Sequence, residues 1–221
     1  MLYLEGVTVT LGGATVLRRL SLAVGTGAIV GLVGRNGAGK TTTLRSIMGL
    51  TRLSSGRIEI DGKTLDGVSP HARARLGIGY LPEDRRLVAS LSVYNNLLIP
   101  AQASGVANSD ERFRRIFTLM PELSEWSARR ASALSGGQQK MLALARAFVN
   151  GHKLLLLDEP FEGVSPALSR RLAQTIRDFQ QAEPGLAVLI AESDFKRAAM
   201  LTRRAYVIER GEVIEEIVLQ T

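Results

Sequence analysis

The chain has 221 residues, 45% of them hydrophobic and 22% charged, which is typical of one large or two small globular domains with a buried core. It has no cysteine, which excludes disulfides and cysteine metal sites, and no apolar run approaches the ~20 residues of a membrane span. The first residues lack the layout of a signal peptide, and the net charge of +7 is spread over short arginine pairs, which favours a solvated surface over a nucleic-acid-binding tail.

The beginning of the chain has the pattern of strands. Residues 2–10 and 20–24 are rich in β-forming residues, and the glycine pair 12–13 separates them, which predicts an antiparallel β region. Residues 28–33 are an uninterrupted apolar run, which predicts a buried parallel strand. Residues 57–62 alternate again and end in Asp-Gly, as a strand followed by a turn does.

A glycine-rich loop follows the apolar run 28–33. Residues 34–41, here called the P-loop, fit G-x-x-x-x-G-K-[ST], and residues 42–48 read as a helix. Glycines let the backbone wrap a phosphate chain, so that amide N–H groups and the helix N-terminus face the anion. Lys40 is expected to reach the β- and γ-phosphates of a nucleotide, and the Thr41 hydroxyl to bind Mg²⁺. The residues expected to contact the nucleotide here are Gly34, Asn36, Gly37, Ala38, Gly39, Lys40, Thr41 and Thr42.

The middle of the chain changes from strand to helix patterns. Residues 77–81 predict a short strand that a proline ends. Apolar residues recur at helical spacing in 93–98 and 110–120, and the small, polar segment 102–108 between them is expected to be a surface loop. We therefore expect 84–130 to be a mostly helical insertion.

The rest of the chain alternates helices and strands. Ser135 can cap a helix that ends near residue 149. Strands alternating with helices after the P-loop imply a parallel sheet with right-handed crossovers. The further expected elements are a strand at 153–158, a helix at 166–181, a strand at 187–191, a helix at 194–201 and a hairpin at 206–213.

Two carboxylates end the apolar strand 153–158. Open α/β sheets bind ligands at the carboxyl ends of their strands. Asp158 is therefore expected to hold Mg²⁺, and Glu159 to act as the general base toward the water that attacks the γ-phosphate. A helix-capping pair would be the interpretation without the P-loop; beside the P-loop, the catalytic interpretation is favoured.

Residues 134–138, Leu-Ser-Gly-Gly-Gln, add a second nest of backbone amides at a helix start. With this segment, here called the signature segment, the chain resembles the ATP-binding-cassette (ABC) ATPases over essentially its whole length. The resemblance implies an α/β P-loop NTPase of ABC type, with a mostly parallel central sheet, an N-terminal antiparallel β region and a helical insertion subdomain. Its single domain would comprise a RecA-like core with the antiparallel β region (1–83 and 131–221) and the helical subdomain (84–130).

The resemblance also implies an ATPase that works as a dimer. In this family two ATPase subunits, identical or different, pack head to tail, and each ATP lies between one P-loop and the signature segment of the other subunit. The residues expected to contact ATP in this way are Ser135, Gly136, Gly137 and Gln138.

A finer resemblance concerns the transported substrate. Residues 34–45, 81–87 and 153–160 resemble ATPase subunits of branched-chain amino-acid importers, while 91–97 and 158–161 also resemble the ATPase of the lipopolysaccharide exporter. The first resemblance implies uptake of branched-chain amino acids or similar solutes through membrane permease subunits, with a substrate-binding protein, and a cytoplasmic location at the inner face of the membrane. Export of lipopolysaccharide type and a soluble ABC ATPase acting on nucleic acid are the alternatives; a nucleic-acid partner is not expected.

Four positions differ from the residues usual in the family. Leu11 stands where an aromatic ring stacks on adenine, and with Val16 it offers apolar contact without a π-face. Glu83 replaces a glutamine beside the metal, where it still accepts from metal-bound water but adds negative charge. Ser193 replaces the switch histidine; serine can donate to the γ-phosphate but cannot become a cation. Ser165 stands where aspartate is frequent. Since the P-loop lysine and both strand-end carboxylates are present, we expect hydrolysis, with a nucleotide sensor without turnover as the alternative.

Overall fold

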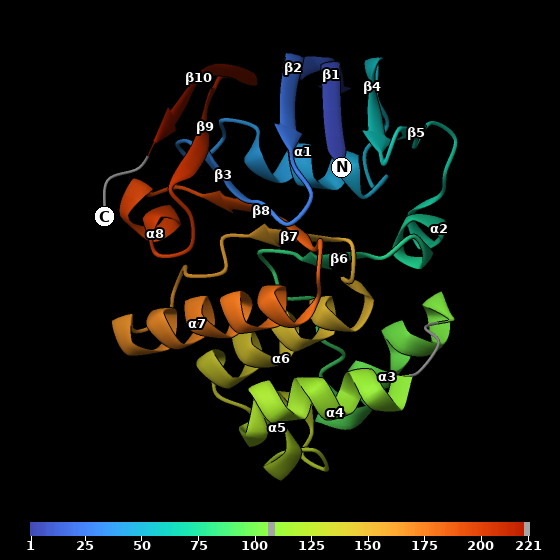
Figure 1. Ribbon diagram of the computed structural model, residues 1–221, viewed down its shortest axis with the longest axis vertical. Coiled ribbons are helices and arrows are strands. Elements are labelled where there is room, and N and C mark those ends of the chain that lie inside the picture. The colour runs from blue at the N-terminus through green and yellow to red at the C-terminus, as the bar shows by residue number, and fades with distance from the viewer. Residues whose placement is uncertain (106–108, 219–221) are drawn as a thin grey trace.

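Two sheets of different kinds organise the chain, and Figure 1 shows them as separate layers. The structure is a computed structural model that describes residues 1–105 and 109–218. The antiparallel sheet has the order β2-β1-β4-β5, with β1 at Leu2–Leu11, β2 at Ala14–Val24, β4 at Ser55–Ile60 and β5 at Lys63–Thr64. The central sheet has the order β10-β9-β3-β8-β7-β6 and is parallel except for the pair β9–β10. Its strands are β3 (Ile29–Val33), β6 (Ile78–Leu81), β7 (Leu154–Asp158), β8 (Ala187–Glu192), β9 (Arg204–Glu209) and β10 (Glu212–Val218). The predicted fold class is confirmed.

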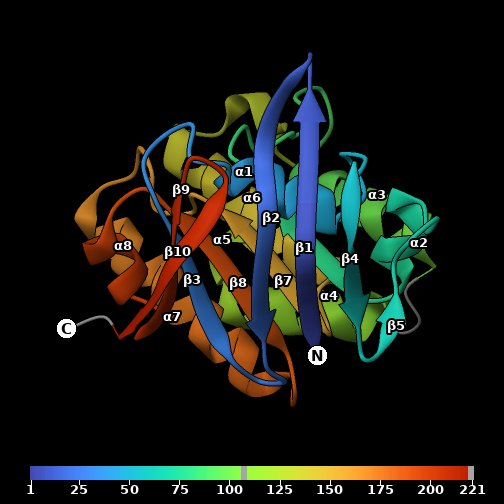
Figure 2. The same ribbon diagram turned by 90° about the horizontal axis from the view of Figure 1, so that it is seen from above.

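Helices cover both faces of the central sheet. Figures 1 and 2 show α1 between the two sheets, and Figure 1 shows α6 and α7 on the opposite face with α3, α4 and α5 beyond them. Among the described residues, no helix combines the length and the hydropathy that crossing a bilayer requires. The helices are α1 (Lys40–Ile47), α2 (Pro70–Arg75), α3 (Val93–Ser104), α4 (Ser109–Leu119), α5 (Pro121–Glu125), the 3-10 helix η1 (Ala131–Ala133), α6 (Gly136–Asn150), α7 (Pro166–Ala182) and α8 (Phe195–Ala199).

The inner strands of the central sheet are buried on both faces. In β7, Leu154 and Leu156 enter the core shared with α1 and the antiparallel sheet, while Leu155 and Leu157 enter the core formed with α6 and α7. Neighbouring side chains point to opposite faces of a strand, so a strand covered on both sides is apolar throughout. This burial explains the uninterrupted apolar run that the sequence shows before its two carboxylates.

Helix α3 is longer than the sequence predicts. The expected loop 102–108 is wrong at its start, because the helix continues to Ser104; residues 106–108 lie outside the described residues. The Ser104 hydroxyl donates to Asn150 Oδ1 of α6 at 2.7 Å, and Gly105 ends the helix in a left-handed conformation (φ 62°). A contact with a distant helix, invisible to local patterns, thus supports the last turn.

Strand β2 is also longer than expected. The predicted strand 20–24 is its second half, because the strand begins at Ala14. Arg19 has a left-handed backbone (φ 46°), and the pairing register with β1 shifts nearby. Leu17 and Leu20 are therefore both buried although they are three positions apart in sequence, which breaks the alternation that marks a strand.

Smaller differences concern element ends. The expected helix 42–48 begins two residues earlier, at Lys40, and the expected helix 194–201 is shorter, Phe195–Ala199. The sequence analysis did not predict α2. Helices α3, α4 and α5 all lie within 84–130; the division into two subdomains remains a prediction.

A buried arginine holds the far end of the helix that follows the P-loop. Arg73 of α2 is 8% exposed, and its guanidinium donates to Ser46 O (2.9 Å), Ile47 O (2.7 Å), Leu65 O (2.7 Å) and Val68 O (2.9 Å). The carbonyls at a helix C-terminus lack partners within the helix and attract a cation. These bonds fix α1 in place, and with it the P-loop at its other end.

Candidate nucleotide-binding site

A cavity of 280 Å³ opens where the P-loop meets the carboxyl ends of the central strands. Residues that the sequence analysis assigned separately to phosphate binding, metal binding and catalysis meet here. The lining residues are Val16, Asn36, Gly37, Gly39, Lys40, Thr41, Thr42, Glu83 and Glu159.

The P-loop follows a path that its glycines permit. A Cβ on Gly34 would lie 2.2 Å from the carbonyl oxygen of Ile208, so only glycine fits there. Gly37 (φ 80°) and Gly39 (φ 114°) have left-handed backbones. Ala38, in contrast, is 7% exposed and packs into the core. The loop therefore lies close to β9, and the first turn of α1 faces the cavity.

Lys40 is almost completely buried, and its ammonium group has three partners. Its Nζ donates to Gly34 O at 2.8 Å and to Arg35 O at 3.3 Å, and lies 3.1 Å from Glu159 Oε1. A buried ion pair is tolerated only when such additional hydrogen bonds satisfy its members. The predicted phosphate ligand and the predicted general base thus neutralise each other in the cavity.

Thr41 and Asp158 form the second polar contact of the site. Thr41 Oγ1 donates to Asp158 Oδ1 at 3.1 Å, and the Tyr80 hydroxyl lies 3.5 Å from Asp158 Oδ2. Asp158 is 0% exposed, and burial is the main reason why its pKa is raised to about 6; Glu83 and Glu159 add to this shift, while the Thr41 hydrogen bond opposes it. The site therefore holds more carboxylates than its lysine can neutralise.

Two remaining candidates, Leu11 for the adenine and Ser193 for the switch position, are not among the lining residues of this cavity. Leu11, at the end of β1, is 47% exposed, and Ser193 directly follows β8. Of the described residues that line the cavity, Val16 is the one from the adenine candidates. The adenine role of Leu11 and the switch role of Ser193 remain predictions.

The signature segment forms a different surface at the start of α6. Ser135 and Gln138 close a capping box: Ser135 Oγ accepts from Gln138 N at 3.3 Å, and Gln138 Oε1 accepts from Ser135 N at 2.8 Å. Ser135 and Gly136 are exposed, whereas a Cβ on Gly137 would lie 2.8 Å from the Leu168 side chain of α7. Among the described residues, the lining of the cavity includes no member of this segment.

The sequence analysis missed two charged residues that contact the turn after β7. Lys140 of α6 is 2% exposed and donates to the Glu159 carbonyl oxygen at 2.7 Å. Glu192, at the end of β8, is 0% exposed and accepts from Phe161 N at 3.1 Å. The signal in the sequence is a charged residue next to apolar ones, and this signal does not indicate which residue the charge contacts.

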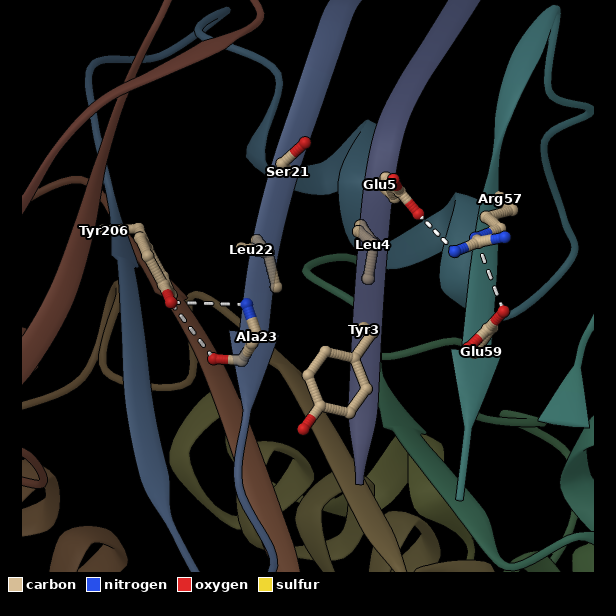
Figure 3. A pocket seen from close by; sticks show the side chains of 9 residues that line it. All are labelled: Tyr3, Leu4, Glu5, Ser21, Leu22, Ala23, Arg57, Glu59 and Tyr206. Atoms are coloured by element: carbon tan, nitrogen blue, oxygen red, sulfur yellow. Dashed lines mark hydrogen bonds and ion pairs between the residues drawn. The ribbon is translucent and has the colours of Figure 1, made fainter. Parts of the chain in front are cut away.

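A larger hollow of 560 Å³ lies on the outer face of the antiparallel sheet (Figure 3). Its charged side chains pair with one another, and the Ser21 and Tyr206 hydroxyls bond to the backbone. Arg57 pairs with Glu5 at 2.6 Å and with Glu59 at 3.4 Å, and the Tyr206 hydroxyl bonds to the backbone of Ala23 at 3.3 Å. The nucleotide motifs lie at the smaller cavity, which therefore remains the candidate site.

Comparisons with known proteins concern the same residues. The model of the family described as ABC transporter matches residues 17–162, which include the P-loop, the signature segment, Asp158 at the end of β7 and Glu159 directly after it. The lipopolysaccharide export system ATP-binding protein LptB of Escherichia coli (strain K12) is 38% identical over 207 residues, 91% of this chain and 84% of the relative. The high-affinity branched-chain amino acid transport ATP-binding protein BraG of Pseudomonas aeruginosa is 34% identical over 214 residues, 97% of this chain and 91% of the relative.

Solved structures agree with these relatives. An ATP-binding subunit of an ABC transporter superposes with a TM-score of 0.86 at 26% identity, covering 99% of this chain and 90% of that one. A dimeric bacterial ABC transporter cassette has the same TM-score at 24% identity and covers both chains fully, which supports the fold alone. With its P-loop cavity, exposed signature segment and strand-end carboxylates on this fold, the chain belongs to the ABC transporter family, and it binds ATP and hydrolyses it to drive transport.

Proposed function

We propose that the cavity beside the P-loop is the catalytic site, with Lys40 binding the phosphates and Glu159 acting as the general base. The observation that carries this proposal is the meeting of four groups in one place. Lys40 lies 3.1 Å from Glu159 Oε1, and Thr41 lies 3.1 Å from Asp158 Oδ1. Phosphoryl transfer depends mainly on positioning and on charge stabilisation, and these two contacts support the proposal because they bring the four groups together.

The donor set fits Mg²⁺. The Thr41 hydroxyl, the Asp158 carboxylate and the nearby Glu83 carboxylate are hard oxygen ligands. Burial and, to a smaller extent, Glu83 and Glu159 raise the pKa of Asp158, and a cation would stabilise these clustered carboxylates. Within the described ranges, no group of three His, Cys, Asp or Glu residues is close enough to hold a metal alone. Phosphate oxygens and water would therefore complete its ligands, and the bound ion would offset charge on the phosphates.

The signature segment supplies the other half of a composite ATP site in this proposal. Ser135 is exposed at the N-terminus of α6, where a helix offers N–H groups to an anion. Its separation from the cavity of the same chain is the reason to assign it to the ATP of a second subunit, which is either another copy of this chain or a different ATPase.

The proposed transport reaction is uptake of branched-chain amino acids or similar small solutes, together with a permease and a substrate-binding protein. The likeness to BraG supports it, because it extends over 97% of this chain and 91% of that protein. Export of lipopolysaccharide type is the second candidate, because the identity to LptB is higher, 38%. Either function places the subunit on the cytoplasmic face of a membrane.

The permease is proposed to dock on the helical side of the central sheet. Of the apolar residues in 84–130, Val93 is 0% exposed and belongs to the core, whereas Val88 is 38% exposed. A groove of 240 Å³ lies between β6 and helices α3 and α6, with Tyr80, Pro100 and Arg146 among its lining residues. A groove of this kind suits a short helical segment of a partner.

The test of hydrolysis is phosphate release by the purified chain, alone and with its membrane partner. Glu159→Gln is expected to lower the rate by about 100-fold or more, the range of general-base effects, while ATP still binds. Unchanged phosphate release by this variant would remove Glu159 from its proposed role.

The test of the transported substrate begins with the membrane proteins that co-purify with the tagged chain. Reconstituted in vesicles, the importer assembly is expected to take up leucine in an ATP-dependent manner, and the Glu159→Gln assembly is the matched control. ATP hydrolysis that lipopolysaccharide stimulates, without leucine uptake, would favour export instead.

A further inference from the structure

The turn that carries Glu159 has a strained backbone. Glu159 has a left-handed conformation (φ 47°), which non-glycine residues adopt at a cost of about 1–3 kcal/mol and keep only when their surroundings hold them. Its N–H donates to the Ala191 carbonyl of β8 at 3.0 Å. This bond fixes the peptide before Glu159, but the peptide after it needs a partner of its own.

Lys140 supplies that partner. Its ammonium group donates to the Glu159 carbonyl oxygen at 2.7 Å, and the Glu162 N–H reaches the same oxygen at 3.2 Å. On the next peptide, Phe161 N–H donates to Glu192 Oε1 at 3.1 Å. A lysine and a glutamate thus hold successive peptides of the turn.

The Lys140 and Glu192 side chains are both buried, so exposure to solvent cannot explain why charged residues stand at these positions. Lys140 is 2% exposed and Glu192 is 0% exposed. Burial lowers the pKa of Lys140 and raises that of Glu192 to about 7, and each charge partly offsets the shift of the other. Among the described residues, Glu192 Oε2 has no hydrogen-bond partner. Buried charges are costly, and both of these are directed at the backbone around Glu159.

Lys140 also connects this turn to the signature segment. It lies on α6, the helix that begins directly after Ser135. The residue before it, Gln139, accepts at Oε1 from Arg85 Nη1 at 3.1 Å, and Arg85 lies two residues after Glu83. The first turns of α6 therefore contact two segments of the proposed catalytic site: the turn after β7, through Lys140, and the loop after β6, through Gln139.

We propose that Lys140 is a positioning residue for ATP hydrolysis, which sets the direction of the Glu159 carboxylate by holding the Glu159 carbonyl and ties it to the helix of the signature segment. The inference rests on the proposed role of Glu159 as the general base. It assigns Lys140 to the chemical step and not to ATP binding, because its contact is with the turn and not with the P-loop.

The first experiment compares Lys140→Met, Lys140→Arg and the exposed control Lys63→Met. We expect Lys140→Met to lower kcat by about 10- to 100-fold, as small displacements of a catalytic group do, with the ATP dissociation constant within about twofold of wild type. Lys140→Arg keeps a donor and is expected to recover most of kcat, and Lys63→Met to behave as wild type. An unchanged kcat in Lys140→Met, or equal losses in its Met and Arg variants, would contradict the proposal.

The second experiment combines Lys140→Met with Glu159→Gln. A residue that acts through Glu159 adds nothing once that carboxylate is gone, so the double variant is expected to match Glu159→Gln within about twofold. Additive losses would show that Lys140 acts in another way and overturn the inference. If Glu159→Gln alone hydrolysed ATP at the wild-type rate, the proposed function itself would fail, and this outcome is distinct from a normal kcat in Lys140→Met.

Discussion

The two surfaces that we propose for ATP are built in opposite ways. The P-loop cavity is made of buried polar groups that bond to one another: Lys40 to Glu159, and Thr41 to Asp158. The signature surface is an exposed helix start, and the contacts of Ser135 stay within its own capping box. The first surface is preorganised by the fold of this chain. The second is stable without a ligand and depends on a neighbour for its function.

This difference means that variants of the two surfaces should separate ATP binding from hydrolysis. In the proposed function, the cavity holds the groups that a single chain needs to bind ATP, whereas the signature surface acts only in the assembled dimer.

Lys40→Met is expected to have the largest effect. Removing the cation leaves the phosphates and the buried Glu159 carboxylate without their partner, and truncation of a buried charge pair lowers affinity by about 100- to 1000-fold. Equilibrium binding of a fluorescent ATP analogue to the isolated chain measures this loss. The surface variant Lys196→Met is the control, and near-normal binding by Lys40→Met would show that the cavity is not the ATP site.

Ser135→Ala is expected to leave binding by the isolated chain within about twofold of wild type and to lower hydrolysis by the assembled ATPase by about 100-fold, the effect of one lost donor at a transition state. The same fluorescent analogue and a phosphate-release assay measure the two quantities. Weaker binding by the isolated chain would mean that both surfaces serve the same chain.

Glu192, buried at the end of β8, should make the free energy of unfolding depend on pH. Burial raises the pKa of Glu192 from 4.5 to about 7, so its contribution to folding is complete below its unfolded pKa and is lost as the pH rises through its folded pKa. Relative to Glu192→Gln, the free energy of unfolding of wild type is expected to fall by about 2 kcal/mol between about pH 5 and about pH 8. Urea unfolding of both proteins measures it; a constant difference across this range would contradict the shift.

The smallest effect is expected for Leu11→Tyr. An aromatic ring that stacks on adenine adds about 0.5–1.5 kcal/mol, so ATP should bind about three- to tenfold more tightly, while GTP, whose base differs, serves as the comparison. Because Leu11 is 47% exposed, the substitution should not disturb the core. Unchanged affinity would assign the base contact to Val16 alone.

Local motifs account for what could be predicted of the site. The P-loop, the signature segment and the carboxylates after β7 each have a fixed spacing with a fixed local geometry, so the sequence indicates their places on a strand end or a helix start. Those features follow from neighbours in the chain. The uninterrupted apolar strand 153–158 likewise indicates a sheet covered on both faces.

Contacts between distant parts of the chain account for the features that could not be predicted from the sequence. Lys140 reaches the Glu159 carbonyl only because α6 packs beside β7, and Arg73 reaches the end of α1 only because α2 folds back on it. The last turn of α3 depends on Asn150 in the same way. In each case the residue type is ordinary and its partner is far away in sequence, so no local period or propensity marks it.

The ion pair between Lys40 and Glu159 has a consequence for the idle enzyme. In the roles proposed above, an arriving phosphate competes with the Glu159 carboxylate for the same ammonium group, so ATP entry would free that carboxylate. ATP binding would then precede the release of the carboxylate, because both depend on the same contact between Lys40 Nζ and Glu159 Oε1, 3.1 Å long.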